Sequence, residues 1–258
     1  RWPSGFAGGL VTKDIRWRAR RLVFTPHPFN EGFFAGKAEF DAAVEKAESP
    51  EDKDKIKGYL LARYEVVLEN GFLKEYKRLK DGEQPGEGAK AWWAYLELQP
   101  ANSWYNNQTY LNTLDPEAVK KFVEVTYDRY YSVVGEDFGK SIPAIFTDEP
   151  NFGVYQSLRF AEDETPVRIP FTDDFDSTYH QTYGDHILDF LPELFWELPD
   201  GRVSVARYRY RDHLSERFAS AFADTIGKWC EEHGIMFTGH LLDEETLESQ
   251  TEAVGEAM

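Results

Sequence analysis

Acidic and imidazole side chains follow two short apolar segments of this sequence. Asp148 and Glu149 come directly after residues 141–147, and His240 follows residues 235–238 after a single glycine. Two carboxylates that face each other across a cleft can cleave a glycosidic bond: one protonates the leaving oxygen, and the other activates water or attacks carbon. The donor must be neutral, and burial beside aromatic side chains raises the pKa of a carboxyl group. The two strand ends are therefore the first candidates for a reactive site.

The second carboxylate is sought in the acidic run that follows the second apolar segment. Glu245 is the best candidate, and Glu244 is a weaker one. Both residues also have a structural interpretation. They could begin a helix over residues 245–258, because acidic side chains in the first turn are favoured by the helix dipole.

Pro150 sets the expected conformation of the residue before it. Because a residue that precedes proline avoids the helical region, we expect Glu149 to leave its strand in an extended conformation. Asp148 and Glu149 could also have purely structural roles, capping a helix or pairing with an arginine. His240 could equally be a structural histidine with satisfied hydrogen bonds.

Aromatic residues are unusually frequent, at 16% of the 258 residues. Tryptophan and tyrosine combine a flat apolar ring with a polar edge, which suits the faces of sugar rings, although a large aromatic core explains the surplus equally well. Trp104, Tyr105 and Asn106 are predicted on a loop, where exposed aromatic and amide groups are binding candidates. Trp92 and Trp93 alternate on the preceding strand, so one is expected in the core, and Trp93 is taken as the candidate that faces a ligand.

The pattern of apolar residues predicts an antiparallel excursion early in the chain. Residues 59–68 and 72–79 form a hairpin signature around Asn70 and Gly71, which supply the positive φ angles of a tight turn. We therefore assign about 40–90 to a charged and β-hairpin insertion.

Later in the chain, helices and short strands alternate. Asp115 and Pro116 predict a helix start, and residues 208–233 form the longest predicted helix. Short strands followed by helices and long loops favour a (β/α)8 TIM-type barrel, which we expect to be partial and to occupy residues 1–258 as one catalytic domain.

A long loop is expected over about 150–200, following the strand that ends at Asp148. It is longer than a simple connector, and we expect it to form one wall of the site. Its candidate stacking rings are Phe152, Tyr155, Tyr179 and Tyr183.

Composition excludes some classes of partner. The formal net charge is −17, so the surface repels phosphate backbones and nucleic acid is not an expected partner. No apolar run is long enough to span a bilayer, so we expect no membrane association. The single Cys230 cannot form an internal disulfide. The first residues contain no initiator methionine or signal peptide, and the last ones read as an interrupted helix. We therefore expect a piece of a longer protein, joined to further domains, with weak or no activity of its own.

Four segments, in order along the chain, resemble the large bacterial and fungal glycoside hydrolases of the α-L-rhamnosidase family 106 type. They are WPSGFAGG (2–9), YLNTLDPEAVKKF (110–122), IFTDEP (145–150) and FTGHLLDEE (237–245). The resemblance implies a (β/α)8 catalytic barrel, a hydrolase that acts on plant or microbial oligosaccharide or polysaccharide, and secretion or a periplasmic location for the full-length protein. It also implies calcium as a cofactor, for which no complete ligand set matches here.

The same resemblance suggests roles for individual residues. Glu149 matches the strand-end acid and is the candidate general acid, with Asp148 positioning it or binding sugar hydroxyls. His240 resembles a substrate-binding or supporting residue, and Glu245 is the candidate partner carboxylate. The sugar, its linkage and the stereochemical outcome stay open.

Two other classes of function compete with hydrolysis. The first is a non-catalytic carbohydrate-binding or vestigial barrel module that keeps a cleft without the reaction. The second is a metal-dependent lyase or isomerase, which is less favoured because its metal would need clustered histidine and acidic ligands, whereas the six histidines are scattered.

Overall fold

The computed structural model describes residues 9–105, 107–243 and 245–253. The chain folds as two compact units. One, here called the helical unit, contains Arg1–Ala19, Gln99–Gly153 and Leu214–Met258. The other, the sheet unit, contains Arg20–Leu98 and Val154–His213. Among the helices described, none has the length and apolar character that crossing a bilayer demands.

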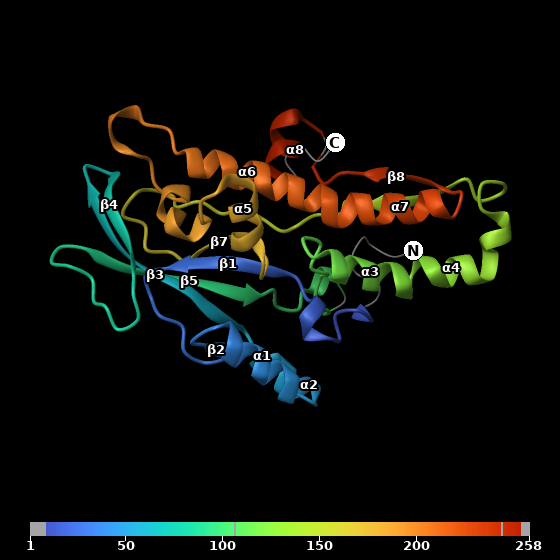
Figure 1. The fold of residues 1–258 in the computed structure, drawn as a ribbon, viewed down its shortest axis with the longest axis horizontal. Coiled ribbons are helices and arrows are strands. Elements are labelled where there is room, and N and C mark those ends of the chain that lie inside the picture. The colour runs from blue at the N-terminus through green and yellow to red at the C-terminus, as the bar shows by residue number, and fades with distance from the viewer. Residues whose placement is uncertain (1–8, 106, 244, 254–258) are drawn as a thin grey trace. The chain divides into compact units, whose positions relative to one another are not determined.

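The sheet unit is built on one six-stranded sheet (Figure 1). Its strands run in the order β2-β3-β5-β1-β7, and β4 also pairs with β3. All of these pairs are antiparallel except β2 with β3. The strands are β1 (Arg20–Thr25), β2 (Phe33–Phe34), β3 (Gly58–Glu69), β4 (Phe72–Leu79), β5 (Lys90–Leu98) and β7 (Val167–Pro170).

The predicted hairpin is confirmed in this sheet. Strands β3 and β4 pair through a turn in which Asn70 has φ 53° and Gly71 has φ 82°. Both angles lie in the left-handed region that a two-residue hairpin turn requires. The charged residues before the hairpin form α1 (Lys37–Lys46) and α2 (Pro50–Lys55). The amide of Asp52 in α2 is capped by the side chain of Ser49.

An aromatic cluster forms the core of the sheet unit. Phe24 of β1 is fully buried, and its ring stacks between Trp92 at 4.8 Å and Phe195 at 4.6 Å between ring centroids. Trp196 meets the same ring edge-on at 5.9 Å, and Tyr64 does so at 5.8 Å. Contacts between aromatic rings stabilise a fold beyond the burial of apolar area alone. This stack therefore joins β1, β3 and β5 firmly to the segment around Phe195.

A partly buried ion pair fixes the other end of β1. Arg20 is buried and pairs with Asp173, which also accepts a hydrogen bond from the Tyr59 hydroxyl at 3.0 Å. Burial, together with the negative charge of Asp173, raises the pKa of Tyr59. The pair ties β1 and β3 to the residues just before α5 (Phe175–Tyr183).

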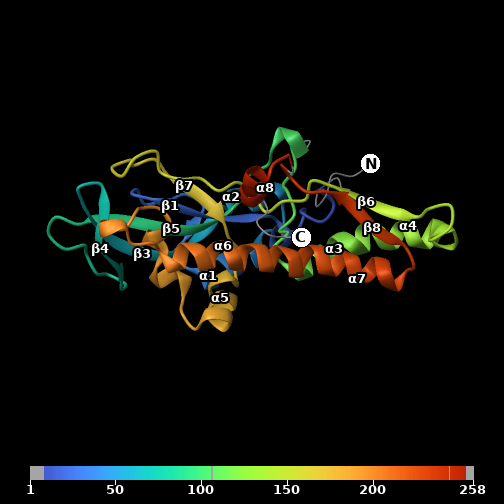
Figure 2. The same ribbon diagram turned by 90° about the horizontal axis from the view of Figure 1, so that it is seen from above.

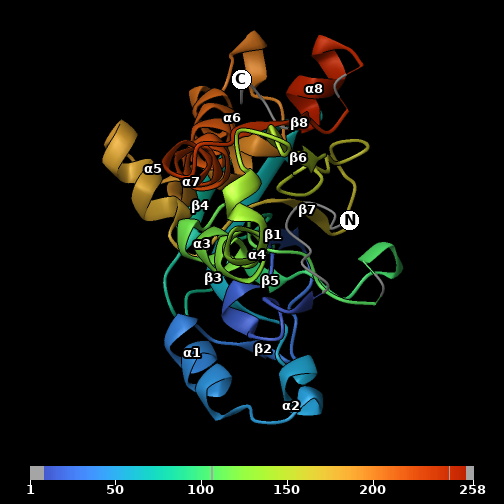
Figure 3. The same cartoon turned by 90° about the vertical axis from the view of Figure 1, so that its right-hand side faces the viewer.

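The helical unit contains a two-stranded parallel sheet. Its strands β6 (Ala144–Asp148) and β8 (Met236–His240) lie side by side next to α7 (Asp224–Glu232), as Figures 2 and 3 show. The other described helices of this unit are α3 (Pro116–Val125), α4 (Tyr127–Val134) and α8 (Leu247–Ala253). The unit boundary falls within α6 (Val205–Phe218), which a π-helical turn at Ala219–Ala223 joins to α7.

Local sequence signals account for the first helix of this unit. As predicted, Asp115 caps α3 by accepting a hydrogen bond from the amide of Glu117, and Pro116 occupies the first turn. One face of α3 is buried through Val119 and Phe122. On α4 and α7, Tyr127 packs against Trp229 at 5.3 Å between ring centroids.

The expected (β/α)8 barrel is wrong. A barrel of that type needs eight parallel strands that each lead into a helix, whereas the largest sheet here is mostly antiparallel. The single catalytic domain expected over 1–258 is instead two compact units. The segment 150–200, expected as one long loop, contains β7 and α5. The short strands of the helical unit favoured a barrel. No local sequence pattern specifies which strands lie next to them in a sheet.

We expect Phe24→Ala to lower the free energy of unfolding by about 3–5 kcal/mol, because it leaves a cavity inside the aromatic stack. Urea denaturation of the whole chain measures this loss. Phe72→Ala is the matched control, since that ring on β4 is 41% exposed, and we expect a change within about 0.5 kcal/mol. Equal losses in the two variants would show that Phe24 is not central to the core.

Candidate functional site

The two strand ends that carry the predicted reactive residues adjoin in the structure. β6 and β8 pair in parallel register, with Asp148 opposite His240. The amide of Glu149 then donates a hydrogen bond to the carbonyl oxygen of His240 at 3.2 Å, which extends the pairing by one residue. Asp148, Glu149 and His240 therefore gather at the carboxyl end of one parallel pair.

A glycine allows the two strands to approach closely at this end. Gly239 is opposite Thr147, and a Cβ added at Gly239 would lie 1.9 Å from the carbonyl oxygen of Thr147. No side chain fits at that distance, so the pairing requires glycine at this position. A hydrogen bond between Thr147 and the buried Tyr127 of α4 also holds the strand end in place. Burial raises the pKa of Tyr127.

The backbone of Glu149 is strained. Its φ angle is 49°, in the left-handed region, so the extended conformation expected from Pro150 is wrong. The other non-glycine residues with positive φ in the described part of the chain are all Asn or Asp, which tolerate this region better. A glutamate in this conformation costs on the order of 1–3 kcal/mol and persists only when its surroundings hold it there.

Hydrogen bonds around Asn151 hold the segment that follows Glu149. The Asn151 side chain donates to the carbonyl oxygen of Glu149 at 3.3 Å and accepts from the amide of Gly153 at 3.1 Å. The Thr113 hydroxyl donates to the Asn151 carbonyl oxygen at 2.6 Å. Sequence reasoning missed Asn151 and Thr113, because neither belongs to a pattern that marks a site.

Tyr105 joins this network. Its hydroxyl hydrogen-bonds with the side chain of Asn151, and partial burial raises its pKa. The ring stacks on Tyr110 at 4.9 Å between centroids. The structure therefore links one of the predicted loop aromatics to the residues that follow Glu149.

The acidic groups at the strand ends face solvent. The side chains of Glu149 and Glu245 are exposed, and Asp148 is half-buried. His240 and Phe146 are also exposed, and their rings meet edge-on at 5.1 Å between centroids. The burial that was expected around Glu149 is absent from this conformation.

Glu245 lies in the turn between β8 and α8. The next residue, Thr246, begins α8 through reciprocal hydrogen bonds with Ser249, in which each hydroxyl accepts from the other residue's amide. The Ser249 hydroxyl also donates to the carbonyl oxygen of Asp243 at 2.7 Å. This capping fixes the turn, so Glu245 is placed just before a helix start and not in its first turn.

The remaining predicted binding residues are not brought to this cluster by the described structure. Trp93 is half-buried on β5, where it pairs with Thr25 and Arg63 in the sheet unit. Asn106, Glu244 and the side chain of Trp104 lie outside the described residues. Of the predicted stacking rings in 150–200, Phe152 and Tyr179 belong to the core, Tyr183 is half-buried, and Tyr155 lines a pocket of the sheet unit.

The described residues do not fit a calcium site. Within them, no group of three or more His, Cys, Asp or Glu side chains is placed to hold a metal ion. The acidic run at 173–176 is used internally: Asp173 pairs with Arg20, and Asp176 accepts hydrogen bonds from the amide of Leu188 and from His186.

Comparisons with known proteins identify no family model, curated protein or solved structure that matches this chain.

We expect Gly239→Ala to destabilise the helical unit by about 3 kcal/mol, because the new methyl group overlaps the Thr147 carbonyl. Gly227→Ala on α7 is the control, since its added Cβ meets nothing within 4 Å, and alanine in a helix should gain up to about 1 kcal/mol. Thermal unfolding of both variants tests the contrast. A neutral Gly239→Ala would show that the strands need no glycine here.

The strain at Glu149 is tested by comparing two substitutions that both remove the carboxylate. Glu149→Gly relieves the positive φ, whereas Glu149→Ala keeps it, so we expect the glycine variant to be about 1 kcal/mol more stable than the alanine variant. Urea denaturation of both proteins gives the difference. If the alanine variant is the more stable one, the left-handed conformation is not present in solution.

Proposed function

We propose that the chain provides the catalytic residues of a glycoside hydrolase, with Glu149 as the general acid. One observation carries the proposal: Asp148, Glu149 and His240 meet at the carboxyl end of a parallel strand pair, and Glu149 is held there in a strained backbone conformation. Strained residues cluster at functional sites. The resemblance of residues 145–150 and 237–245 to family 106 hydrolases supports the same assignment.

Each residue then has a chemical task. Glu149 protonates the leaving oxygen, and Glu245 activates a water molecule or attacks the sugar carbon. Asp148 and His240, opposite each other on the two strands, hydrogen-bond sugar hydroxyls and orient the ring. Because Glu149 is exposed in the free protein, the bound sugar itself must exclude water from the carboxyl group.

A second candidate function is supported by the exposure of the same carboxylates. Glu149 and Glu245 both face solvent, whereas a general acid that acts by burial would lie in an apolar setting before substrate arrives. A non-catalytic carbohydrate-binding module would use Asp148, His240 and Tyr105 for hydrogen bonds and stacking. It would require no proton donor.

We expect Glu149→Gln to slow hydrolysis of a glycoside with a poor leaving group by about 10²–10⁴-fold, because general acid catalysis contributes that much. An aryl glycoside, whose leaving group departs without protonation, should slow far less. Glu136→Gln is the control, since Glu136 is an exposed carboxylate of the same unit that precedes β6. Rates are measured on a panel of aryl and alkyl glycosides with the whole chain.

The outcomes separate the two candidates. Equal slowing of both substrates would make Glu149 a base or nucleophile. Sugar binding without turnover on any glycoside would support the binding module. Turnover that Glu149→Gln leaves unchanged would contradict the assignment of this cluster.

A further inference from the structure

The face of the β6–β8 pair that points away from α4 is exposed. Thr147 of β6 is buried and hydrogen-bonds with Tyr127 of α4. Because side chains alternate along a strand, its neighbours Phe146 and Asp148 point the other way. The face on that side, here called the open face, is formed by Ala144, Phe146, Asp148, Met236, Thr238 and His240, which are all half-buried or exposed. Parallel strands are ordinarily covered on both faces, so a ligand has room to lie on this one.

Phe146 is the largest apolar side chain of the open face. It is 55% exposed, although burial of such a side chain stabilises a fold. Met236, diagonal to it in the register of the two strands, is 64% exposed. Among the described residues, the ring of Phe146 contacts one other ring, that of His240. More than half of Phe146 is therefore available to a ligand without any change in the fold.

The open face changes from apolar to polar toward the carboxyl end of the strands. A β-strand rises about 3.3 Å per residue, so Phe146 and Asp148 stand about 6.6 Å apart along β6. Asp148 lies opposite His240. A carboxylate accepts hydrogen bonds, and an imidazole can donate one. An apolar ring beside these two groups matches a small cyclic ligand that is apolar on its face and carries hydroxyl groups at its edge.

Other occupants of the open face fit these residues less well. A second copy of the chain would bring two acidic proteins together, and a net charge of −17 opposes this. A peptide strand would pair along an edge of the sheet and would leave its face open. Residues 144–149 and 236–247 contain no lysine or arginine, and they include Asp148, Glu149, Asp243 and Glu245. This local charge disfavours an anionic ligand.

We propose that Phe146 is the stacking platform for the sugar ring at this site. The apolar face of the ring lies on Phe146, its hydroxyl groups reach Asp148 and His240, and the sugar carries no anionic group. The inference rests on the proposed function, which assigns Asp148 and His240 to sugar hydroxyls, and it adds the side chain that orients the ring. An aromatic side chain suits this task because it is flat and offers a large apolar area.

The test measures sugar binding apart from turnover, in the whole chain carrying Glu149→Gln. Ligand-observed NMR titrations use methyl β-D-glucoside, methyl β-D-galactoside and methyl α-L-rhamnoside as neutral probes. Methyl β-D-glucuronide is the anionic probe. We expect at least one neutral probe to bind, and the glucuronide to bind at least about fivefold more weakly than that probe at low salt, where charge repulsion is strongest.

Variants of Phe146 in the same background locate the ring. Phe146→Ala should weaken binding of the neutral probe about five- to tenfold, as expected for the loss of one aromatic contact. Phe146→Leu keeps an apolar side chain without the flat ring, so it should lose most of that affinity too, whereas Phe146→Trp should retain it. Thermal unfolding should be unchanged in all three, because the side chain is exposed.

Tyr130→Ala is the matched control. Tyr130 is an aromatic residue of the same unit, 48% exposed on α4, and its loss should leave the affinity for the neutral probe unchanged. Equal weakening by Tyr130→Ala and Phe146→Ala would overturn the proposal.

The outcomes separate this inference from the proposed hydrolysis. Binding that depends on Phe146, without turnover of any glycoside by the chain with Glu149 intact, supports the platform and contradicts only the hydrolase assignment. Binding that Phe146→Ala leaves unchanged, or that Phe146→Leu retains in full, overturns the platform and leaves that assignment standing. The platform is also overturned if no neutral probe binds, if the glucuronide binds as tightly, or if sedimentation shows a dimer that Phe146→Ala dissociates.

Discussion

The close backbone approach between Gly239 and Thr147 is the constraint on which the candidate site depends. It lets β6 and β8 pair in parallel up to their last residues, and this pairing sets Asp148 opposite His240. Parallel strands cannot be joined by a tight turn. The chain between β6 and β8 is therefore long, and it includes helix α7. The hydrogen bond of Thr147 with Tyr127 and the packing of α7 on β8 hold the pair from its helical side.

Directly after the β6–β8 strand pair, a residue with a strained backbone is followed by a segment that hydrogen bonds hold in place. Glu149 takes a conformation that glutamate disfavours, and the Asn151 hydrogen bonds hold the segment that follows it. The result is an exposed carboxyl group with a fixed backbone. Its chemistry then depends on the ligand that covers it, because the carboxyl group is exposed in the free protein.

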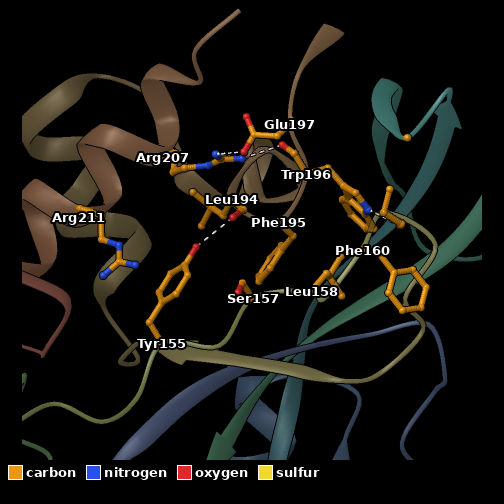
Figure 4. A pocket seen from close by; sticks show the side chains of 12 residues that line it. Tyr155, Ser157, Leu158, Phe160, Leu194, Phe195, Trp196, Glu197, Arg207 and Arg211 are labelled. Atoms are coloured by element: carbon orange, nitrogen blue, oxygen red, sulfur yellow. Dashed lines mark hydrogen bonds and ion pairs between the residues drawn. The ribbon is translucent and has the colours of Figure 1, made fainter. Parts of the chain in front are cut away.

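In the sheet unit, one set of aromatic side chains serves both stability and shape. Phe195 and Trp196 pack on Phe24 in the core, and the same two residues line a pocket that Arg207 and Arg211 also line (Figure 4). The excess of aromatic residues is thus largely a matter of packing, and Phe152 and Tyr179 belong to it too. What distinguishes the pocket from the core is the pair Arg207 and Arg211, whose spacing of four residues brings both to one face of α6.

The sequence by itself determined the local elements. Asn70 and Gly71 specify a hairpin turn, and Asp115 with Pro116 specifies a helix start, because each acts through backbone angles and hydrogen bonds a few residues apart. It also marked the strand ends at Glu149 and His240. Only the tertiary structure decided that the larger sheet is mostly antiparallel, that Glu149 is left-handed and exposed, and that Arg211 stacks on Tyr155. These features arise from contacts between residues that are far apart in the chain. The energies of such contacts cannot be read from a short sequence pattern.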